Sequence, residues 1–370
     1  MRLTTRNNPR DGSGRVLIVR VGAMGDVLHA MPAVWALRRS HPELRIGWVI
    51  EPRWLPLLKA AGAMERDAAM PLVDEIYLAA TREWKKSPVS AKTLGDIQSL
   101  KRELRAGKYD LCVDMQGSLR SAVIGRMAGV GSLAGPAKPR EWPAAWLYQR
   151  KIRTSAEHVV EQGCELLGGA VGESLQAARV ELPVDAVAEE RCAARLSASA
   201  TDTRRLVLVA PGAGWGAKQW PPERYGAVAA MLAKWGYRVL VNAYSATDEL
   251  ANAVVRGSGG KSEVFPCDMA ELIAVTRRVS LLIAGDTGPL HLAAALERPA
   301  VALFGPTDPA RNGPYGTRSR VLRHGGERRD HRRLSDPEAG LLAITVDEVV
   351  EAAMELLEGR AGHGTGKVDR

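Results

Sequence analysis

The N-terminal half of the chain alternates short apolar runs with longer segments whose apolar residues recur at helical spacing. This alternation is typical of a parallel sheet covered by helices, because strands buried on both faces are apolar throughout. The predicted strands of this half are 15–21, 45–50, 74–78 and 110–115. A first helix is predicted to begin near Asp26 and to bend at Pro32, since proline removes a backbone hydrogen bond.

The second half of the chain repeats the same alternation. Its predicted strands are 205–210, 237–242, 281–285 and 300–304, with helices between them. Two Rossmann-like domains are therefore expected, over 1–185 and 204–344. A linker is predicted between them at 186–203, where helical periodicity is lost before the next apolar run.

The pattern near the C-terminus predicts a helix over 345–359. Thr345 and Glu348 have the spacing of a capping box, and Gly359 provides a stop signal. Four apolar residues share one face of this helix: Val349, Val350, Ala353 and Leu357. The helix is expected to pack back on the N-terminal domain, and 360–370 to form a disordered tail.

Composition narrows the class of protein. With 370 residues, 46% of them hydrophobic and 25% charged, the chain resembles ordinary globular proteins of two domains. No apolar run approaches the roughly 20 residues that span a bilayer, and the polar start lacks a secretory signal, so an intracellular protein is expected. The cysteines show no metal-binding spacing, which argues against disulfides and zinc.

The formal net charge of +9 predicts an anionic partner. Nucleic acid, a phosphorylated metabolite and an acidic membrane surface all fit this charge, and charge alone does not choose among them. The segment 320–334 is rich in Arg and His and has few apolar positions. That segment is predicted to be irregular.

The turn after the first predicted strand ends on a carboxylate. Gly22 and Gly25 allow the backbone to turn sharply, and the following helix presents N–H groups and the positive end of its dipole. Because Asp26 would repel a phosphate, it is interpreted either as facing a hydroxyl or a sugar, or as a helix cap. The residues alone leave both interpretations open.

Two loops of the second half also follow predicted strands. A Gly-rich loop carries Lys218, which offers positive charge to a phosphate or is merely an exposed lysine of an ordinary turn. In the other loop, Asp286, Thr287 and Gly288 lie at a helix N-terminus, where an anion can bind and where Asp286 can equally be a cap. His291 lies one turn further, a position more typical of a packed side chain than of a catalytic base.

Several motifs together resemble glycosyltransferase family 9, and within it the ADP-heptose:lipopolysaccharide heptosyltransferases of type I. They are VGAMGDVLHAMPA, GAGWGAKQWPPERY and AGDTGPLHLAAALERPAVALFGPTDP, with TREWKK and DMQGSLRSA in support. The resemblance covers about residues 15–320. It implies an α/β protein of GT-B fold, whose two Rossmann-like domains face each other across a cleft, the N-terminal one binding the acceptor and the C-terminal one the nucleotide sugar.

The resemblance implies an inverting transfer of L-glycero-D-manno-heptose from ADP-heptose to the Kdo-bearing lipid A of the lipopolysaccharide inner core. Asp26 would be the general base and Lys218 a contact to the donor phosphates. The other implied donor-binding residues are Ala213, Gly214, Asp286, Thr287, Gly288, Pro289 and His291. The implied acceptor-binding residues are Arg82, Lys85, Lys86, Gln116 and Arg120.

No cofactor and no essential metal are expected, because ADP leaves without a proton and positive groups near Lys218 can stabilise its charge. The resemblance further implies a monomer at the cytoplasmic face of the inner membrane, touching anionic lipid peripherally and binding no nucleic acid. Ala213 and Gly214 replace small hydroxyl residues common in the type I enzymes, which shifts phosphate contacts to backbone amides. Two alternatives stay open: a nucleotide-sugar enzyme of the same form with another acceptor, and a non-catalytic nucleotide-sugar binder.

Overall fold

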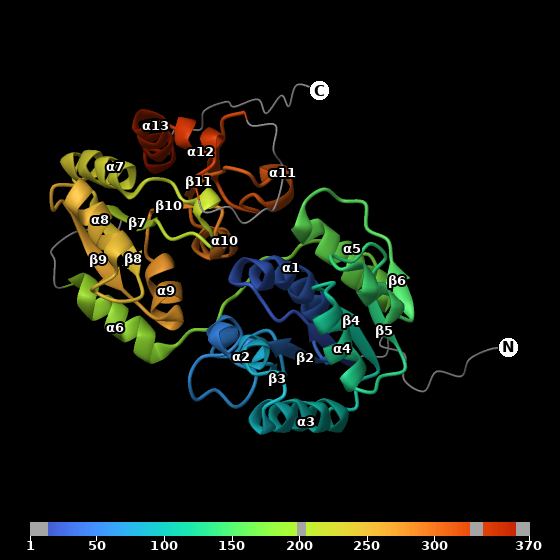
Figure 1. The fold of residues 1–370 in the computed structure, drawn as a ribbon. Helices are drawn as coiled ribbons and strands as arrows, with labels where there is room; N and C mark the ends of the chain where they lie inside the picture. Colours follow the sequence, from blue (N-terminus) through green and yellow to red (C-terminus); the bar gives the residue numbers. More distant parts are fainter. Residues whose placement is uncertain (1–13, 198–204, 326–335, 360–370) are drawn as a thin grey trace. The chain divides into compact units, whose positions relative to one another are not determined.

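The computed structural model describes residues 14–197, 205–325 and 336–359. The chain divides into two compact units, which meet in the sequence between Asp185 and Ala186 and are called unit 1 and unit 2 (Figure 1). Within the described residues, each unit is built on one six-stranded sheet with helices packed on it. This architecture confirms the predicted α/β fold.

The sheet of unit 1 is parallel throughout and has the order β3-β2-β1-β4-β5-β6. Its strands are β1 Arg15–Val19, β2 Arg45–Ile50, β3 Glu75–Leu78, β4 Leu111–Asp114, β5 Leu133–Pro136 and β6 Arg150–Ile152. The four predicted strands are confirmed as β1 to β4. The pattern missed β5 and β6 because they are short and lack the continuous apolar run of a central strand.

The helices of unit 1 place apolar residues against this sheet. They are α1 Met24–Ser40, α2 Thr81–Lys86, α3 Ala91–Ala106, α4 Leu119–Met127 and α5 Val159–Val171, with 3-10 helices η2 Pro52–Leu57 and η3 Trp142–Trp146. Helices α3 and α4 pack in the cluster that contains Leu17 and Val19 of β1, while α1 and α5 pack against each other. Helix α1 begins before Asp26 and continues through Pro32.

The sheet of unit 2 is also parallel, in the order β12-β11-β10-β7-β8-β9. Its strands are β7 Leu206–Ala210, β8 Arg238–Ala243, β9 Ser262–Pro266, β10 Leu281–Gly285, β11 Ala300–Leu303 and β12 Ser319–Leu322. Counted from the first strand of each unit, both sheets have the strand order 3-2-1-4-5-6. The change of direction therefore lies between β1 and β4 in unit 1 and between β7 and β10 in unit 2.

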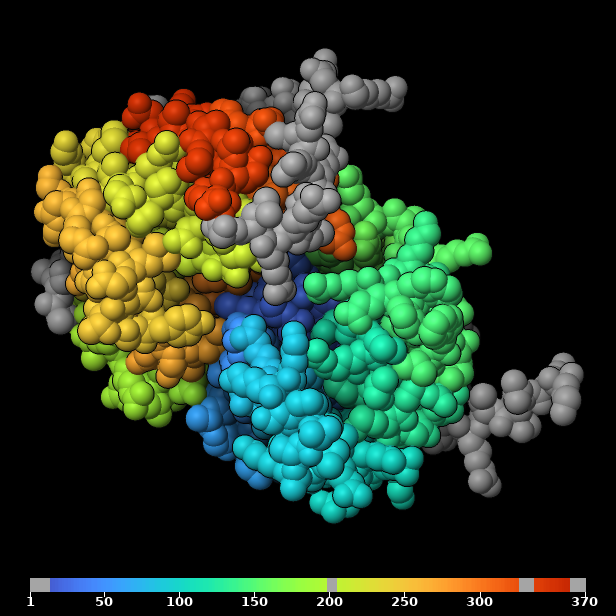
Figure 2. All heavy atoms as spheres, viewed as in Figure 1, coloured from blue at the N-terminus to red at the C-terminus, as the bar shows by residue number. Residues whose placement is uncertain are grey.

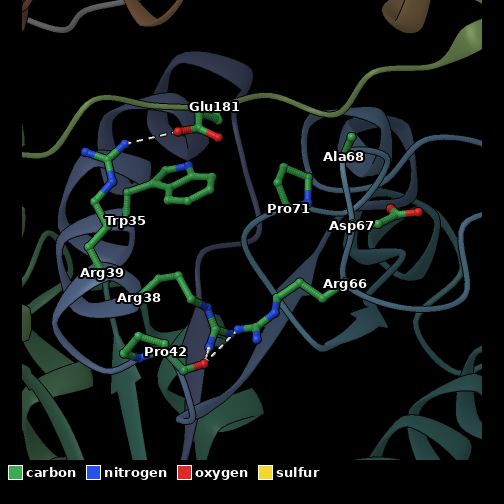
Figure 3. A pocket seen from close by; sticks show the side chains of 9 residues that line it. All are labelled: Trp35, Arg38, Arg39, Pro42, Arg66, Asp67, Ala68, Pro71 and Glu181. Atoms are coloured by element: carbon green, nitrogen blue, oxygen red, sulfur yellow. Dashed lines mark hydrogen bonds and ion pairs between the residues drawn. The ribbon is translucent and has the colours of Figure 1, made fainter.

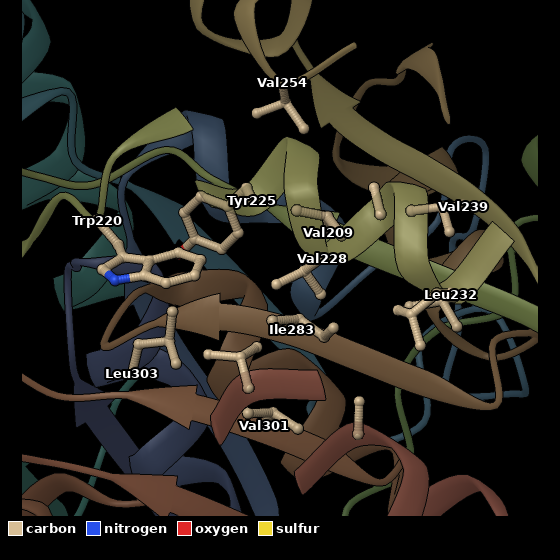
Figure 4. Packing of buried hydrophobic residues seen from close by; sticks show 14 of the residues in the cluster. Val209, Trp220, Tyr225, Val228, Leu232, Val239, Val254, Ile283, Val301 and Leu303 are labelled. Carbon is tan, nitrogen blue, oxygen red and sulfur yellow. The ribbon is translucent and has the colours of Figure 1, made fainter. Parts of the chain in front are cut away.

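The helices of unit 2 bury apolar residues, except the short α11, which buries none. They are α6 Ala186–Ser197, α7 Pro222–Lys234, α8 Glu249–Gly257, α9 Met269–Thr276, α10 Gly288–Ala295, α11 Pro309–Asn312, α12 Ala339–Ala343 and α13 Val346–Leu357, with the 3-10 turn η5 Gly216–Lys218. Figure 4 shows the core in which Val209 and Ile283 of the strands meet Tyr225 and Leu232 of α7. Fully buried Trp220 joins this core and donates from Nε1 to the carbonyl of Ile344, 3.2 Å away.

The structure differs from the predicted linker over 186–203, because its first part is helix α6. The carboxylate of Glu189 on α6 forms ion pairs with Arg277 and Arg278, and Cys192 is fully buried, so α6 is part of unit 2. The loss of helical periodicity in this segment marks the end of helix α6, and the residues before that point are helix, not linker. Residues 198–203 of the predicted linker lie outside the described residues.

Two expectations near the C-terminus also need correction. Helix α13 has the predicted capping box, but it buries Val349 and Ala353 in the core of unit 2, where the strands β10 and β11 offer an apolar face. Residues 320–322, predicted to be irregular, belong to strand β12, and Arg320 is paired with Glu355 of α13. Residues 326–334 and the predicted tail 360–370 lie outside the described residues.

In the part of the chain that is described, no helix combines the length and apolar character needed to cross a bilayer.

Candidate functional site

Most of the predicted site residues follow the carboxyl ends of strands on either side of the change of direction in each sheet, whereas those on α2 follow the edge strand β3. In unit 1, Asp26 comes after β1 and Gln116 after β4. In unit 2, Lys218 comes after β7 and Asp286 after β10. Parallel α/β sheets bind ligands at this point, because the loops on the two sides diverge and leave a crevice. Both units therefore carry candidate residues where their topology favours a ligand.

The carboxylate of Asp26 is held by two partners in the first turn of α1. Its Oδ1 forms an ion pair with Nη2 of Arg20 at 3.0 Å, and its Oδ2 accepts a hydrogen bond from the backbone N–H of Ala23 at 3.1 Å. Nε of Arg20 also donates to the backbone carbonyl of Asp26 at 3.0 Å. The Asp26 side chain is still 36% exposed. The protein therefore holds this carboxylate in one orientation. It caps the helix and still reaches solvent.

Gln116 supports the backbone of the Asp26 loop. Its Oε1 accepts hydrogen bonds from the N–H groups of Val21 and Gly22 at 2.8 and 3.3 Å. The turn that carries Gln116 is fixed in turn by Asp114, whose Oδ1 accepts from the N–H groups of Gln116 and Gly117 at 2.9 and 3.1 Å. Asp114 is fully buried, and burial raises its pKa against the effect of these hydrogen bonds.

We expect Gln116→Met to lower the free energy of unfolding by about 1–3 kcal/mol, because two backbone donors lose their acceptor at similar side-chain volume. Thermal denaturation would measure this loss. Gln116→Glu keeps an oxygen acceptor and should retain most of the stability. Equal stability of the wild type and the Met variant would show that the amides of Val21 and Gly22 do not depend on Gln116.

The basic candidates of unit 1 differ in how they are held. Arg120 donates from Nη1 to Oγ1 of Thr81 at 3.2 Å, and Thr81 donates to the buried carboxylate of Glu51 at 2.9 Å. The backbone N–H of Arg82 also donates to Glu51, at 3.1 Å. The structure thus brings the starts of α2 and α4 together around Glu51.

The two lysines of α2 lie further along this helix and are exposed. Lys86 forms an ion pair with Glu83 at 3.3 Å, and both side chains are largely in solvent. Such a pair stabilises the helix little. Lys85 and Lys86 therefore fit a surface that receives an anion better than they fit a preformed pocket.

In unit 2 the candidates form a buried polar cluster around Asp286. Oδ2 of Asp286 is paired with Nζ of Lys218 and accepts from Oγ1 of Thr307 at 2.6 Å, while Oδ1 lies 3.1 Å from Nε2 of His291. The four residues follow β7, β10 and β11, which are neighbours in the sheet. Asp286 is only 8% exposed. Burial alone would raise its pKa, but the hydrogen bond with His291 and the charge of Lys218 hold the pKa below its ordinary value.

The remaining donor-site candidates surround this cluster. Thr287 precedes α10 and donates from Oγ1 to the carbonyl of Gly285 at 3.2 Å, and Gly288 and Pro289 form the first turn of the helix. Ala213 and Gly214 lie in the loop between β7 and η5. An added Cβ at Gly214 would meet no atom within 4 Å, so open space lies beside the backbone at this position.

Several residues of these clusters did not stand out in the sequence. Arg20, Glu51 and Thr307 are polar residues at or just after strand ends, and that position was the signal that could have identified them. Their partners, however, are remote in sequence, and only the folded sheet brings them together. The ring centroid of Trp215 lies 4.4 Å from Nζ of Lys218.

A separate cavity of about 540 Å³ lies at the far end of α1 from Asp26 (Figure 3). None of the predicted site residues lines it. Its lining residues are Trp35, Arg38, Arg39, Pro42, Arg66, Asp67, Ala68, Pro71 and Glu181. The guanidinium of Arg38 is already bound to Asp74 and to backbone carbonyls, and Arg39 is paired with Glu181 at 3.3 Å. The charges of Arg38 and Arg39 are therefore already paired with groups of unit 1 itself.

Metal-binding and thiol chemistry have little support in the described residues. No group of three or more His, Cys, Asp or Glu side chains among them is arranged to hold a metal ion. The four cysteines are buried and unbridged, and burial raises the pKa of each thiol.

Comparison with known proteins places this geometry in a family context. A family model described as glycosyltransferase family 9 (heptosyltransferase) matches residues 97–340. Lipopolysaccharide heptosyltransferase 1 of Pseudomonas aeruginosa is 30% identical over 83% of this chain and 82% of its own length. The solved structure of E. coli heptosyltransferase WaaC with ADP has a TM-score of 0.74 at 26% identity, over 92% of this chain and 99% of that one. A second WaaC structure, with ADP-2-deoxy-2-fluoro heptose, has a TM-score of 0.71 at the same identity and coverage.

Proposed function

Because the chain belongs to glycosyltransferase family 9, the heptosyltransferase family, we propose that it transfers L-glycero-D-manno-heptose from ADP-heptose to Kdo-bearing lipid A. The Pseudomonas aeruginosa relative is a lipopolysaccharide heptosyltransferase 1, and WaaC has been solved with ADP and with a fluorinated ADP-heptose. Those names favour an ADP-heptose donor and a lipopolysaccharide acceptor. The observation that carries the proposal is Asp26, an oriented and partly exposed carboxylate at the start of α1.

Asp26 acts in this proposal as the general base. Its carboxylate takes the proton of the attacking acceptor hydroxyl, and the hydroxyl oxygen forms a bond to the anomeric carbon of the heptose. The bond from that carbon to the diphosphate oxygen breaks, and its electron pair leaves with ADP. Attack opposite the leaving group inverts the anomeric configuration. Arg20 keeps the carboxylate in one orientation through its ion pair.

The donor half of the proposal uses the polar cluster of unit 2. The leaving ADP gains negative charge, which the ammonium of Lys218 and the positive N-terminal end of α10 can stabilise without a metal. Thr287 offers a hydroxyl, and the loop at Ala213 and Gly214 and the first turn of α10 offer backbone groups. The buried Asp286 positions Lys218, and His291 orients Asp286.

The acceptor half uses the basic residues of unit 1. Kdo sugars carry carboxylates and lipid A carries phosphates, so Arg82, Lys85, Lys86 and Arg120 suit this substrate. Gln116 holds the loop between β1 and Asp26 through its hydrogen bond with the N–H of Val21. We place the enzyme as a monomer at the cytoplasmic face of the inner membrane, where its net charge of +9 favours anionic lipid.

The test is a transfer assay with the purified full chain, ADP-heptose and detergent-dispersed Kdo-bearing lipid A, read by mass spectrometry. We expect the acceptor to gain the mass of one heptose. ADP-glucose as donor and lipid A without Kdo as acceptor serve as controls and should give little product. Binding of ADP-heptose without transfer would overturn the acceptor assignment, and failure to bind the donor would overturn the proposed function as a whole.

A further inference from the structure

Two large aromatic side chains of unit 1 stand out in solvent. Trp142 and Trp146 of η3 are 64% and 72% exposed, and their ring centroids lie 5.6 Å apart. Leu119 and Val123 of α4, the helix that packs against η3, are 42% and 45% exposed. These four residues are called the tryptophan surface. In Figure 2 the teal and green segments that contain α4 and η3 lie at the surface of unit 1.

The tryptophan surface is built on rigid elements. The N–H of Leu119 donates to the carboxylate of Glu141 at 2.8 Å, and the N–H of Glu141 donates to the carbonyl of Gly117 at 2.9 Å. These bonds fix the start of α4 against the start of η3. Ala144 and Ala145 anchor η3 because they are buried beneath it. The aromatic rings are therefore presented outward by a fixed backbone and not by a loose loop.

Basic residues border the tryptophan surface. Lys138 and Arg140 precede η3 directly, Arg126 lies on α4 one turn after Val123, and all three are exposed. Glu141 is an exposed acid in this region, and its carboxylate is engaged with the N–H of Leu119. Tryptophan prefers the headgroup level of a bilayer, and lysine and arginine prefer anionic headgroups beside it.

We propose that the tryptophan surface docks unit 1 on an anionic phospholipid bilayer, with Trp142 and Trp146 inserted at the headgroup level. This inference rests on the proposed function, because it gives a lipid-anchored acceptor a route to the site. Leu119 is followed directly by the acceptor candidate Arg120, and Gln116 lies just before α4. An acceptor whose acyl chains stay in the bilayer can thus present its sugars to these residues.

The first test measures binding to vesicles of phosphatidylethanolamine and phosphatidylglycerol, without donor or acceptor. We expect the double variant Trp142→Ser with Trp146→Ser to partition into vesicles about tenfold more weakly, because it removes the apolar area that would be buried. Trp235→Ser, which removes a 45% exposed tryptophan of unit 2, is the matched control and should bind like the wild type. Circular dichroism checks that each variant is folded.

The charged border gives a second, independent readout. Lys138→Gln with Arg140→Gln should weaken binding to these anionic vesicles severalfold and leave binding to phosphatidylcholine vesicles unchanged. Brominated lipids should quench wild-type tryptophan fluorescence more than that of the Trp142 and Trp146 double variant. Unchanged vesicle binding in the double variant would overturn the inference. A wild type that is a dimer and a double variant that is a monomer would also overturn the inference. The tryptophan surface would then bind a second copy of the chain and not a bilayer.

Activity separates this inference from the proposed function. The double variant should transfer heptose to a deacylated, water-soluble Kdo acceptor at the wild-type rate and to a vesicle-embedded acceptor more slowly. If the wild type binds vesicles through the two tryptophans but transfers heptose to neither acceptor, the proposed function fails and the docking surface stands. An equal loss with both acceptors would show a structural role for the tryptophans and would overturn the docking surface.

Discussion

Replacing Asp26 with asparagine is expected to lower kcat for heptose transfer by about a thousandfold while the affinity for ADP stays unchanged. Asparagine has nearly the same shape and can still accept the hydrogen bond from Ala23, so the start of α1 should keep its structure. It cannot take the proton of the acceptor hydroxyl, and it leaves Arg20 without a carboxylate partner. Steady-state kinetics on both substrates would show a loss in kcat with little change in KM for the donor.

Asp96→Asn provides a matched control for this experiment. Asp96 is an exposed aspartate on α3, and its replacement removes the same charge from a helix of unit 1 that follows neither β1 nor β4. Its activity should equal that of the wild type. If Asp26→Asn retained more than about a tenth of wild-type kcat, Asp26 would not be the base, and its helix-capping role would be its main one.

The second large effect is expected at Asp286. Asp286→Asn should lower the free energy of unfolding by about 3–5 kcal/mol, because the nearly buried ammonium of Lys218 loses its counter-charge. Donor affinity should fall as well, since Lys218 and Thr307 lose the group that orients them. Chemical denaturation measures the first effect, and calorimetric titration with ADP measures the second.

Two comparisons make the Asp286 result specific. Glu83→Gln breaks an exposed ion pair with Lys86 and should change stability by less than about 1 kcal/mol. Adding Lys218→Met to Asp286→Asn should restore part of the lost stability, because the uncompensated charge is removed. A double variant as unstable as the sum of the single variants would contradict this account of the pair.

The Asp286 pair also predicts a pH dependence of stability. The pKa of Asp286 lies below its ordinary value of 3.8 in the folded protein, so the carboxylate stabilises the fold above that pH. This contribution is lost as the pH falls through the lower pKa of the folded state. The difference in unfolding free energy between the wild type and Asp286→Asn should therefore be constant from neutral pH to about pH 5 and shrink in stronger acid.

The sequence was most informative where one physical signal dominates a segment. Strands β1 and β10 are continuous apolar runs, RVLIV and LLIAG, and both were predicted from that pattern. Strand β6 has the sequence RKI at the edge of its sheet, where neither face demands apolar residues, so pattern alone missed it. Helix α6 was assigned to a linker because its weak periodicity ends in a segment with none. Its ion pairs with Arg277 and Arg278, which follow α9, are tertiary contacts that the local pattern does not show.

The candidate site shows the same division. Asp26, Lys218 and Asp286 could be picked out because each follows an apolar strand and precedes a helix. The partnerships of these residues could not be predicted. Lys218 and Asp286 are remote in sequence and meet only because β7 and β10 are neighbours in the sheet. Likewise, nothing in the sequence indicated that Gln116 would hold the Asp26 loop by its backbone.

Within residues 14–197, 205–325 and 336–359, each six-stranded sheet is drawn from one of the two units, and no strand is exchanged between them. A recombination event near residue 185 would therefore transplant a complete sheet with its loops and sever no hydrogen-bonded ladder. Because each sheet comes from its own stretch of the chain, the sequences of the two units can diversify on separate evolutionary paths.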